Sequence, residues 1–328
     1  MSATELFDRF SHLNIVIIGD VMIDRYLEGR VNRISPEAPV PVVHLHQEEN
    51  RLGGAANVAL NIEAMGATPY LFSVIGDDPN GALLRSLLPE NNISSKYMLA
   101  DPARTTTVKT RVIAQHQHLL RVDREDVSPI SEERGQELLQ QLRDLLDQKE
   151  IHLILFQDYN KGTLTQSLIR EVILEALRRD IPTAVDPKYD NFWAYRHVTL
   201  FKPNLREMEQ QLQESLSAEL PALEKAAREV TRRLGNAYTM ITLSEKGLFV
   251  AGKEVTELIP TQERSIADVC GAGDTVISLM SLGLAAKMDV RQIATLANLA
   301  GGQVCEKVGV VPVDREQLAA EYAALDKG

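Results

Sequence analysis

Cysteine is scarce in this chain of 328 residues. The two cysteines, Cys270 and Cys305, lack the spacing of a metal site, so we expect packed thiols in a reducing compartment rather than a disulfide. Positive charge is also in short supply, and the formal net charge is -11. This balance argues against a general nucleic-acid-binding protein, whose affinity would rest on basic patches that neutralise phosphates.

Long apolar runs are missing as well. No stretch approaches the roughly 20 residues that a membrane-spanning helix requires, and residues 1–13 lack the basic start and apolar core of a signal peptide. We therefore expect a cytoplasmic protein with no membrane partner and no nucleic-acid partner. The remaining composition, with 44% hydrophobic and 25% charged residues, is ordinary for a globular enzyme.

Short apolar segments predict strands that are buried on both faces, as in a parallel sheet. Helical patterns lie between them, and this alternation predicts an α/β fold with a doubly wound, mostly parallel sheet. The expected strands are residues 14–20, 151–156, 183–186 and 238–243, and the clearest helical patterns are 164–179 and 223–234.

Two regions break this rhythm. Residues 26–48 and 97–123 are rich in Val, Thr, Arg and His and alternate partially, which predicts antiparallel strands of a small sheet. Such a sheet could form a lid over a ligand or an oligomer interface. Because no repeat or linker divides the chain, we expect one domain over residues 1–328 with lid segments near 26–48 and 97–123. His116 and His118 are assigned to surface or lid packing rather than to a metal site.

A glycine-rich segment, residues 268–275, precedes an apolar helical pattern over residues 276–286. Small residues at a helix start leave backbone N–H groups open, and the helix dipole favours an anion there. Asp274 could accept a proton from a substrate hydroxyl while those N–H groups hold the charge of a transferred phosphoryl group. The structural alternative is a turn capped by Asp274 and Thr275. The small residues concerned are Gly271, Ala272 and Gly273.

The usual nucleotide fingerprints are absent. The chain contains neither GxxxxGK[ST] nor GxGxxG, so the sequence disfavours a P-loop enzyme and a dinucleotide-dependent dehydrogenase.

Residues 268–275 instead resemble the C-terminal signature D-T-x-G-A-G-D of the ribokinase-like (PfkB) carbohydrate kinases, with Val269 where many members have Thr. Residues 51–59 resemble the N-terminal signature of that family, a Gly-Gly pair followed by Asn. The resemblance covers nearly the whole chain. It implies a ribokinase-like fold and an ATP- and Mg²⁺-dependent kinase in which Asp274 is the catalytic base and residues 271–273 form the anion hole.

Four further segments, residues 33–42, 158–162, 186–188 and 202–207, are similar to the kinase domain of bacterial heptose 7-phosphate kinases. This likeness implies phosphorylation of D-glycero-D-manno-heptose 7-phosphate at C1, on the route to ADP-heptose for lipopolysaccharide. Many of those kinases carry an adenylyltransferase with an H-x-G-H motif. No such motif occurs in this sequence, so we expect a stand-alone kinase, and the lid segments imply a homodimer.

The resemblance also implies the nucleotide and metal residues. Asn204 and Glu207 match N-x-x-E, in which Glu organises Mg²⁺ through water; the alternative is an N-terminal helix cap with Glu at the third position. A monovalent cation such as K⁺ is a further candidate. Asn298 could equally be an ordinary polar residue of a packed helix. The expected nucleotide-binding set is Asn204, Glu207, Ser244, Lys246, Gly247, Asp268 and Asn298.

For the sugar, Asp24 and Asn57 match positions that bind hydroxyls in the family, and a carboxylate with an amide suits a vicinal diol. Asp24 could also be a simple turn residue. The 7-phosphate requires a second anion site, although each candidate cation alone could be a surface residue or an ion-pair partner. Lys161 and Lys188 are favoured because each follows a predicted strand. The expected substrate-binding set is Asp24, Gly53, Gly54, Asn57, Arg33, Arg51, Arg111, Lys161 and Lys188.

Two alternatives remain open. The acceptor could be another sugar, such as fructose 6-phosphate or ribose. The chain could also be a non-catalytic sugar or nucleotide sensor of the same fold, although a sensor has no need for the base Asp274.

Overall fold

A computed structural model describes residues 3–115 and 117–325. Its main sheet has nine strands in the order β13-β12-β11-β10-β9-β8-β1-β4-β5. The strands from β11 to β5 run parallel, whereas β12 and β13 form an antiparallel edge. The strand bounds are β1 Asn14–Gly19, β4 Thr68–Gly76, β5 Met98–Asp101, β8 Leu153–Gln157, β9 Thr183–Asp186, β10 Leu200–Phe201, β11 Tyr238–Thr242, β12 Leu248–Gly252 and β13 Thr256–Ile259.

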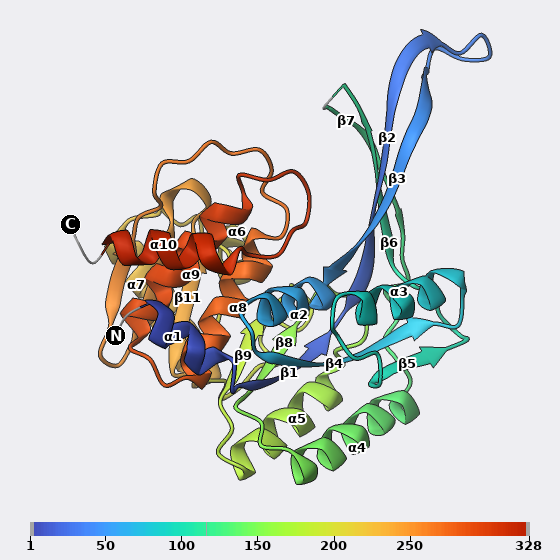
Figure 1. Ribbon diagram of the computed structural model, residues 1–328. Helices are drawn as coiled ribbons and strands as arrows, with labels where there is room; N and C mark the ends of the chain where they lie inside the picture. Colours follow the sequence, from blue (N-terminus) through green and yellow to red (C-terminus); the bar gives the residue numbers. More distant parts are fainter. Residues whose placement is uncertain (1–2, 116, 326–328) are drawn as a thin grey trace.

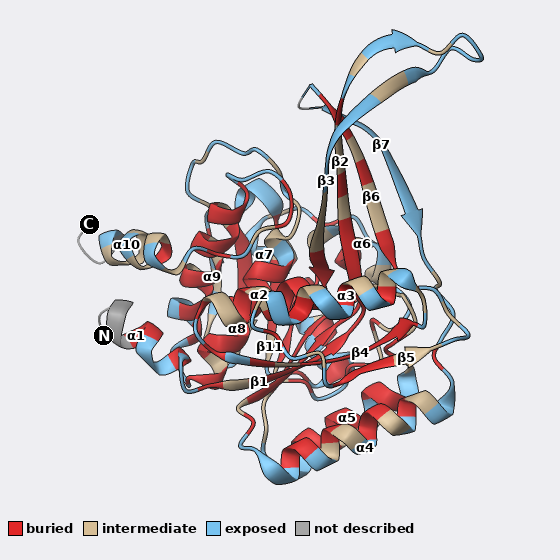
Figure 2. Ribbon diagram, turned by 45° about the vertical axis from the view of Figure 1, so that its right-hand side comes forward, coloured by how far each residue is buried: buried red, intermediate tan, exposed pale blue. Residues whose placement is uncertain are grey.

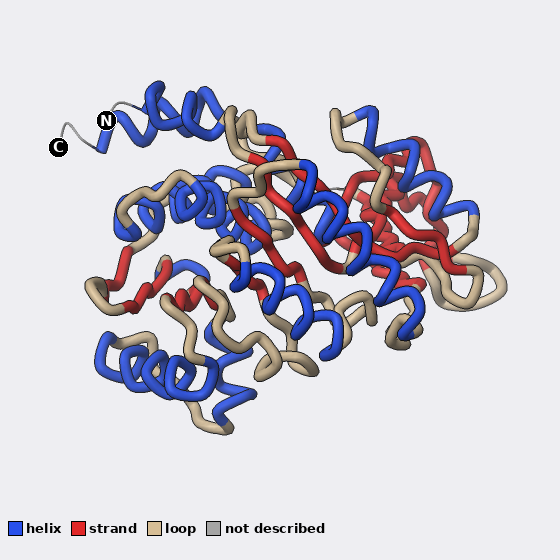
Figure 3. The backbone as a smooth tube through the Cα atoms, turned by 90° about the horizontal axis from the view of Figure 1, so that it is seen from below, coloured by secondary structure: helices blue, strands red, loops and turns tan. Residues whose placement is uncertain are grey.

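Helices cover both faces of this sheet (Figures 1 and 3). One core packs beneath α1 Ala3–Phe10, α2 Ala55–Ala64, α3 Pro79–Glu90, α8 Ala272–Ala285, α9 Val290–Val304 and α10 Arg315–Leu325. The other packs beneath α4 Glu132–Gln148, α5 Gln166–Arg178, α6 Leu205–Leu212 and α7 Leu220–Leu234. Alternate residues of a strand enter opposite cores: Ile15 and Ile17 of β1 join the first, Val16 and Ile18 the second. This explains why β1 is apolar at successive positions.

The structure confirms the α/β class and the four predicted parallel strands, which appear as β1, β8, β9 and β11. Because these strands are parallel, their carboxyl ends meet at one edge of the sheet. That edge is where polar residues follow the strands: Asp20 after β1, Gln157 at the end of β8, Asp186 at the end of β9 and Lys202 after β10. Ligands of open α/β sheets gather at such an edge.

A second sheet of four strands, in the order β3-β2-β6-β7, projects from this body (Figure 1). It comprises β2 Val21–Ile34, β3 Pro41–Gly54, β6 Val108–Ala114 and β7 Gln117–Arg124. The outer part of β2 and β3 is largely exposed, whereas the inner part is buried against the body (Figure 2). We call residues 29–46 the outer arm.

The prediction that the small sheet is antiparallel is partly wrong. The pairs β2–β3 and β6–β7 are antiparallel, but β2 and β6 are parallel. Moreover, residues 98–101 form β5, which pairs with β4 in the main sheet. The division into one domain with two lid segments stays a prediction, and residue 116 in the second segment lies outside the described residues.

Both cysteines are unpaired thiols, Cys305 buried and Cys270 half-buried, which confirms the expectation of packed thiols. Exposed His118 lies in β7, and its neighbour His116 lies outside the described residues. Within residues 3–115 and 117–325 no group of three or more His, Cys, Asp or Glu side chains could hold a metal ion. Over the same ranges, no helix is both long and apolar enough to cross a membrane.

Candidate active site

Asp274 lies in the first turn of α8, buried at the carboxyl edge of the main sheet. Its Oδ2 accepts a hydrogen bond of 2.8 Å from Asn57 Nδ2. Its Oδ1 accepts two, of 2.6 Å from the Tyr159 hydroxyl and 3.0 Å from Gln157 Nε2. Burial raises the pKa of Asp274 to about 6, although the hydrogen bonds from Tyr159 and Asn57 act in the opposite direction. A carboxylate with this pKa is ionised at neutral pH and is basic enough to accept a proton.

The start of α8 is shaped for an anion. Gly271 is the N-cap with a left-handed φ of 82°, and among the described residues no side chain caps this end. A Cβ atom at Gly271 would lie 2.9 Å from Asn57 Nδ2, so a side chain there would disturb the amide that binds Asp274. Asp274 lies in this first turn, where the helix dipole favours an anion, although the Ala272 amide already donates to the carbonyl oxygen of Val269 at 3.4 Å.

Lys202 places a positive charge beside this turn. Its Nζ forms a buried ion pair of 2.9 Å with Asp186 Oδ2. A Cβ atom built on Gly273 would lie 3.8 Å from Lys202 Nζ, which shows how near the ammonium group is to the predicted anion hole. The same Cβ atom would lie 3.9 Å from Asp186 Oδ2, so an ammonium and a carboxylate both border this turn, and the binding of a phosphoryl group by Gly271, Ala272 and Gly273 stays a prediction.

Gly53 and Gly54 are required by the backbone and by Asp24. A Cβ atom on Gly53 would lie 2.2 Å from Asp24 Oδ2. Gly54 has a φ of 61° and a Cβ there would lie 2.4 Å from the carbonyl oxygen of Asp20. The glycine pair therefore lets β3 end close to β2 and leads directly into α2, which carries Asn57.

Asp24 is buried and forms an ion pair with Arg111, which is buried as well. The Arg111 guanidinium also lies over the ring of Tyr26, 5.3 Å from its centroid. Since the two charges compensate each other and remain at the base of the small sheet, the pair can offer both an acceptor and donors to a polyhydroxylated ligand. Asp24 is therefore more than a turn residue, and its binding to sugar hydroxyls stays a prediction.

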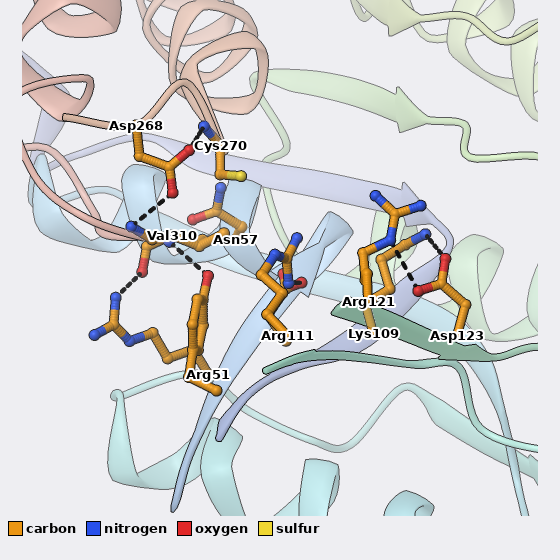
Figure 4. Close-up of polar contacts among 12 residues, drawn as sticks. Arg51, Asn57, Lys109, Arg111, Arg121, Asp123, Asp268, Cys270 and Val310 are labelled. Atoms are coloured by element: carbon orange, nitrogen blue, oxygen red, sulfur yellow. Dashed lines mark hydrogen bonds and ion pairs between the residues drawn. The ribbon is translucent and has the colours of Figure 1, made fainter. Parts of the chain in front are cut away.

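Arg51 is held by several polar contacts in this structure. It binds both carboxylate oxygens of Glu49, at 2.6 and 2.9 Å, and donates to the carbonyl oxygens of Val308 and Val310 at 3.1 and 3.2 Å. Its guanidinium lies over Tyr26, 4.8 Å from the ring centroid. Arg51 thus ties β3 to the segment after α9 (Figure 4), and its binding to the substrate phosphate stays a prediction.

Asp268 also organises the backbone. Its Oδ1 accepts from the Cys270 amide at 3.1 Å and its Oδ2 from the Gly309 amide at 3.0 Å (Figure 4). Although burial opposes the change, these hydrogen bonds hold the pKa of Asp268 below its ordinary value. Burial and Asp268 together raise the pKa of the Cys270 thiol to about 11, so the thiol stays protonated. Asp268 fixes the turn before α8 in this way, and its role in nucleotide binding stays a prediction.

The other predicted cations differ in position. Arg33 is exposed on the outer arm, opposite Val42, and within one chain it does not join the Asp274 cluster. Lys161 forms an ion pair of 2.8 Å with Glu125 at the inner end of the small sheet. Lys188 pairs with Glu207 and lies over the Tyr159 ring, 5.7 Å from its centroid. Arg111, Lys161 and Lys188 lie nearer the carboxyl edge of the main sheet than Arg33 does, and the binding of the distal phosphate by any of the predicted cations stays a prediction.

Asn204 and Glu207 form the predicted capping box of α6. Asn204 Oδ1 accepts from the Glu207 amide at 2.9 Å, and Glu207 Oε2 accepts from the Asn204 amide at 2.8 Å. The other oxygen of Glu207 receives Lys188. The cap holds a nearly buried carboxylate in place, and a carboxylate is the ligand type that Mg²⁺ takes together with water and phosphate oxygens. The residues present therefore fit a magnesium–nucleotide complex.

The predicted nucleotide loop lies at the far end of the same edge. Ser244 and Lys246 are exposed in a single helical turn, and Gly247 has a φ of 91° with its Cα packed against the carbonyl of Ile259. Asn298 of α9 donates to the carbonyl oxygen of Pro260 at 2.8 Å. The loop and Asn298 thus contact the same strand end, which brings these distant candidates together.

Reasoning from the sequence missed Gln157, Tyr159 and Lys202. Each lies at the end of a strand or just after it, and Tyr159 and Lys202 belong to family-like segments. They are recognised as site residues only by their contacts with Asp274 and Asp186, which are distant in the sequence. Asp20 was also missed: its carboxylate accepts from the amides of Tyr159, Lys161 and Thr163 at 2.9–3.0 Å and so fixes the loop after β8.

A family model described as pfkB family carbohydrate kinase matches residues 12–316. The chain belongs to this family. Two similar curated PfkB relatives are both named Bifunctional protein HldE. The one from Syntrophotalea carbinolica is 41% identical over 97% of this chain and 65% of its own length, and the one from Campylobacter curvus is 37% identical over 90% and 62%. The chain thus spans less than two thirds of the length of either relative.

Solved PfkB structures confirm the ribokinase-like fold. Phosphofructokinase-2 from Escherichia coli, in a structure with potassium, superposes with a TM-score of 0.81 and 18% identity over 96% of this chain and 99% of that one. Ribokinase from Arabidopsis thaliana, complexed with ribose and ATP, gives a TM-score of 0.72 and 14% identity over 94% and 98%. At these identities the likeness concerns the fold alone.

Proposed function

We propose that this PfkB carbohydrate kinase transfers the γ-phosphoryl group of ATP to the C1 hydroxyl of D-glycero-D-manno-heptose 7-phosphate, giving the 1,7-bisphosphate for ADP-heptose and lipopolysaccharide synthesis. The observation that carries the kinase chemistry is the buried carboxylate of Asp274 beside the uncapped start of α8. The sugar assignment is supported by the heptose kinase-like segments and by the relatives named HldE.

The reaction needs a base and a site for developing negative charge. Asp274 would take the proton of the acceptor hydroxyl, and the hydroxyl oxygen would displace ADP from the γ-phosphorus. Since the transition state of phosphoryl transfer is loose and highly charged, positioning and electrostatics supply most of the acceleration. The N–H groups at the start of α8 and the ammonium of Lys202 would stabilise that charge.

Mg-ATP would lie between α8 and the loop at residues 244–247. Glu207, held by its cap with Asn204, would orient Mg²⁺ through water. Ser244, Lys246 and Asn298 would border the adenosine. A monovalent cation such as K⁺ stays a further candidate, and a rise in turnover when K⁺ replaces a bulky organic cation would support it.

The sugar would lie between Asp24 and Asn57, with Arg111 beside its hydroxyls and Lys161 or Lys188 towards the distal phosphate.

We expect the enzyme in the cytoplasm, where ATP is supplied. We also propose a homodimer formed through the small sheet, because this sheet exposes apolar side chains on the outer arm and on β7. They include Ile34, Val40, Leu45, Leu120 and Val122, each 51–60% exposed.

A coupled ADP-release assay tests the proposal. Heptose 7-phosphate should be turned over with a higher kcat/KM than fructose 6-phosphate or ribose. The reverse ranking would contradict the assignment of heptose 7-phosphate as the substrate but not the kinase activity. Binding of ATP without turnover of any sugar would instead favour a sensor.

Asp274→Asn should lower kcat by on the order of 10² or more while ATP still binds, as for the loss of a positioned base.

A further inference from the structure

Asp274 is surrounded unevenly by hydrogen-bond donors. A carboxylate offers about four lone-pair positions on its two oxygens. In this structure Oδ1 accepts from Tyr159 at 2.6 Å and from Gln157 at 3.0 Å, whereas Oδ2 accepts from Asn57 alone, at 2.8 Å. Both acceptor positions of Oδ1 are thus occupied. The position left for a substrate hydroxyl is on Oδ2.

The two groups that donate to Oδ1 cannot easily become hydrogen-bond acceptors there. Burial, followed by the charges of Asp274 and Asp186, raises the pKa of Tyr159 well above its ordinary value, so the phenol keeps its proton and donates it. Gln157 is buried, and its Nε2 also lies 3.4 Å from Asp186 Oδ2. Because both neighbours of that amide are carboxylates, its NH₂ group and not its carbonyl must face them.

The donor on Oδ2 is fixed as well. Asn57 Oδ1 faces the side-chain amide of Asn61 at 3.4 Å, so its Nδ2 points to Asp274. The absence of a side chain at Gly271 leaves room for this contact. Asn57 therefore locates Oδ2 without filling it.

We propose that Tyr159 and Gln157 are positioning residues that saturate Oδ1 of Asp274 and thereby make Oδ2 the atom that accepts the substrate proton. They act through Asp274 and need not touch the sugar. The identity of the substrate that is deprotonated rests on the proposed kinase function. The orientation of the Asp274 carboxylate by Tyr159 and Gln157 does not depend on that function.

Tyr159→Phe isolates the effect, because it removes one oxygen and keeps the ring that packs under Lys188. The hydroxyl stabilises the ionised form of Asp274, so its loss should raise the pKa of that carboxyl above about 6. The charged groups that also face Asp274, namely Asp186, Lys202 and Lys188, are unchanged in the variant. The acid limb of kcat/KM should move to higher pH by roughly one unit, and kcat should fall roughly tenfold.

Tyr195→Phe is the matched control. Tyr195 is fully buried and donates at 2.7 Å to Asp158, a second buried aspartate whose pKa is raised to about 6, first by burial and then by Asp20. The control removes the same type of hydrogen bond from a carboxylate outside the Asp274 cluster. In Tyr195→Phe the acid limb of kcat/KM should lie at the same pH as in the unchanged protein. A limb that moves with Tyr195→Phe and not with Tyr159→Phe would overturn the proposal.

A measurement without substrate separates this proposal from the proposed function. The carboxyl carbon signal that Asp274→Asn removes from the ¹³C NMR spectrum reports the titration of Asp274 directly. Its midpoint should rise in Tyr159→Phe and in Gln157→Met, which keeps the volume of the side chain but loses the donor. An unchanged midpoint in both variants would refute the positioning role, even if heptose 7-phosphate is a good substrate. A shifted midpoint in a protein that phosphorylates no heptose would refute only the function.

Discussion

At the scale of single residues, Asp274 combines catalytic potential with a cost to stability. Burial raises its pKa from 3.8 to about 6, so the folded state binds this proton more tightly than the unfolded chain does. The folded state is therefore penalised as pH rises from about 4 to about 6, and the full penalty, about 3 kcal/mol, persists above that range.

Asp274→Asn should relieve this penalty, and under the proposed mechanism it should also lower kcat. The free energy of unfolding of the variant, relative to the unchanged protein, should increase between pH 4.5 and pH 7.5 by about 2 kcal/mol. Because the amide also disturbs the hydrogen bond from Asn57, the change with pH is the informative quantity. Urea unfolding at both pH values measures it. A difference that is constant with pH would show that Asp274 titrates normally.

Gly53 leaves the space that Asp24, a residue of the proposed sugar site, occupies. In Gly53→Ala the new Cβ would fall 2.2 Å from Asp24 Oδ2 and 2.9 Å from Met22 Cγ. Asp24 must move, so the KM for the sugar should rise roughly tenfold or more while the KM for ATP changes little. Steady-state kinetics with each substrate varied in turn measures both. Equal changes in the two KM values would contradict a local role for Gly53.

Residue identities near the site were predictable only in part. Asp274, Gly53 and Asn57 lie in signatures that a reader of the sequence can find. Tyr159 and Gln157 carry no such mark, since their role comes from Asp274, which folding brings to them from a distant part of the chain. Nor did the sequence indicate that Arg51 contacts Glu49 and two carbonyl groups of a distant segment.

At the scale of elements, α4 carries a glycine that its helix does not need. Gly135 lies inside the helix, and a Cβ there would meet nothing within 4 Å. Gly135→Ala should therefore raise the free energy of unfolding by about 0.5–1 kcal/mol, because the unfolded chain loses freedom and the folded helix loses nothing. Denaturant unfolding tests this. The variant also serves as the control for Gly53→Ala, and its kinetic constants should stay unchanged.

The elements of the main sheet were predictable because burial on both faces produces continuous apolar runs such as residues 15–18. The small sheet was harder. Residues 98–101 were expected to join it, but β5 pairs with β4, and β6 lies parallel to β2 rather than antiparallel. Alternation in a strand indicates that one face is covered, but it does not identify the neighbouring strand or its direction.

At the scale of the whole molecule, the small sheet leaves apolar surface uncovered in one chain. Leu120 and Val122 of β7 are 58% and 52% exposed, two positions apart and therefore on one face. If this face forms the proposed dimer, light scattering should give a mass near twice 36.4 kDa. Leu120→Arg with Val122→Arg should shift it to about one chain.

Leu177→Arg is the control for that experiment. Leu177 is 52% exposed on α5, which belongs to the body and not to the small sheet. Its replacement should leave the mass unchanged. A mass near 36.4 kDa for the unchanged protein would contradict the dimer, and equal losses of mass in both variants would show that the effect of arginine is not local to β7.

The central claim is that Asp274 activates a sugar hydroxyl for phosphoryl transfer, and ³¹P NMR of the reaction tests it most directly. With Mg-ATP and heptose 7-phosphate, the unchanged protein should consume the γ-phosphate signal and produce a second sugar phosphate signal coupled to the anomeric proton. Asp274→Asn should bind ATP and show almost none of this product. An Asp274→Asn protein that forms the bisphosphate at a near-normal rate would contradict the account.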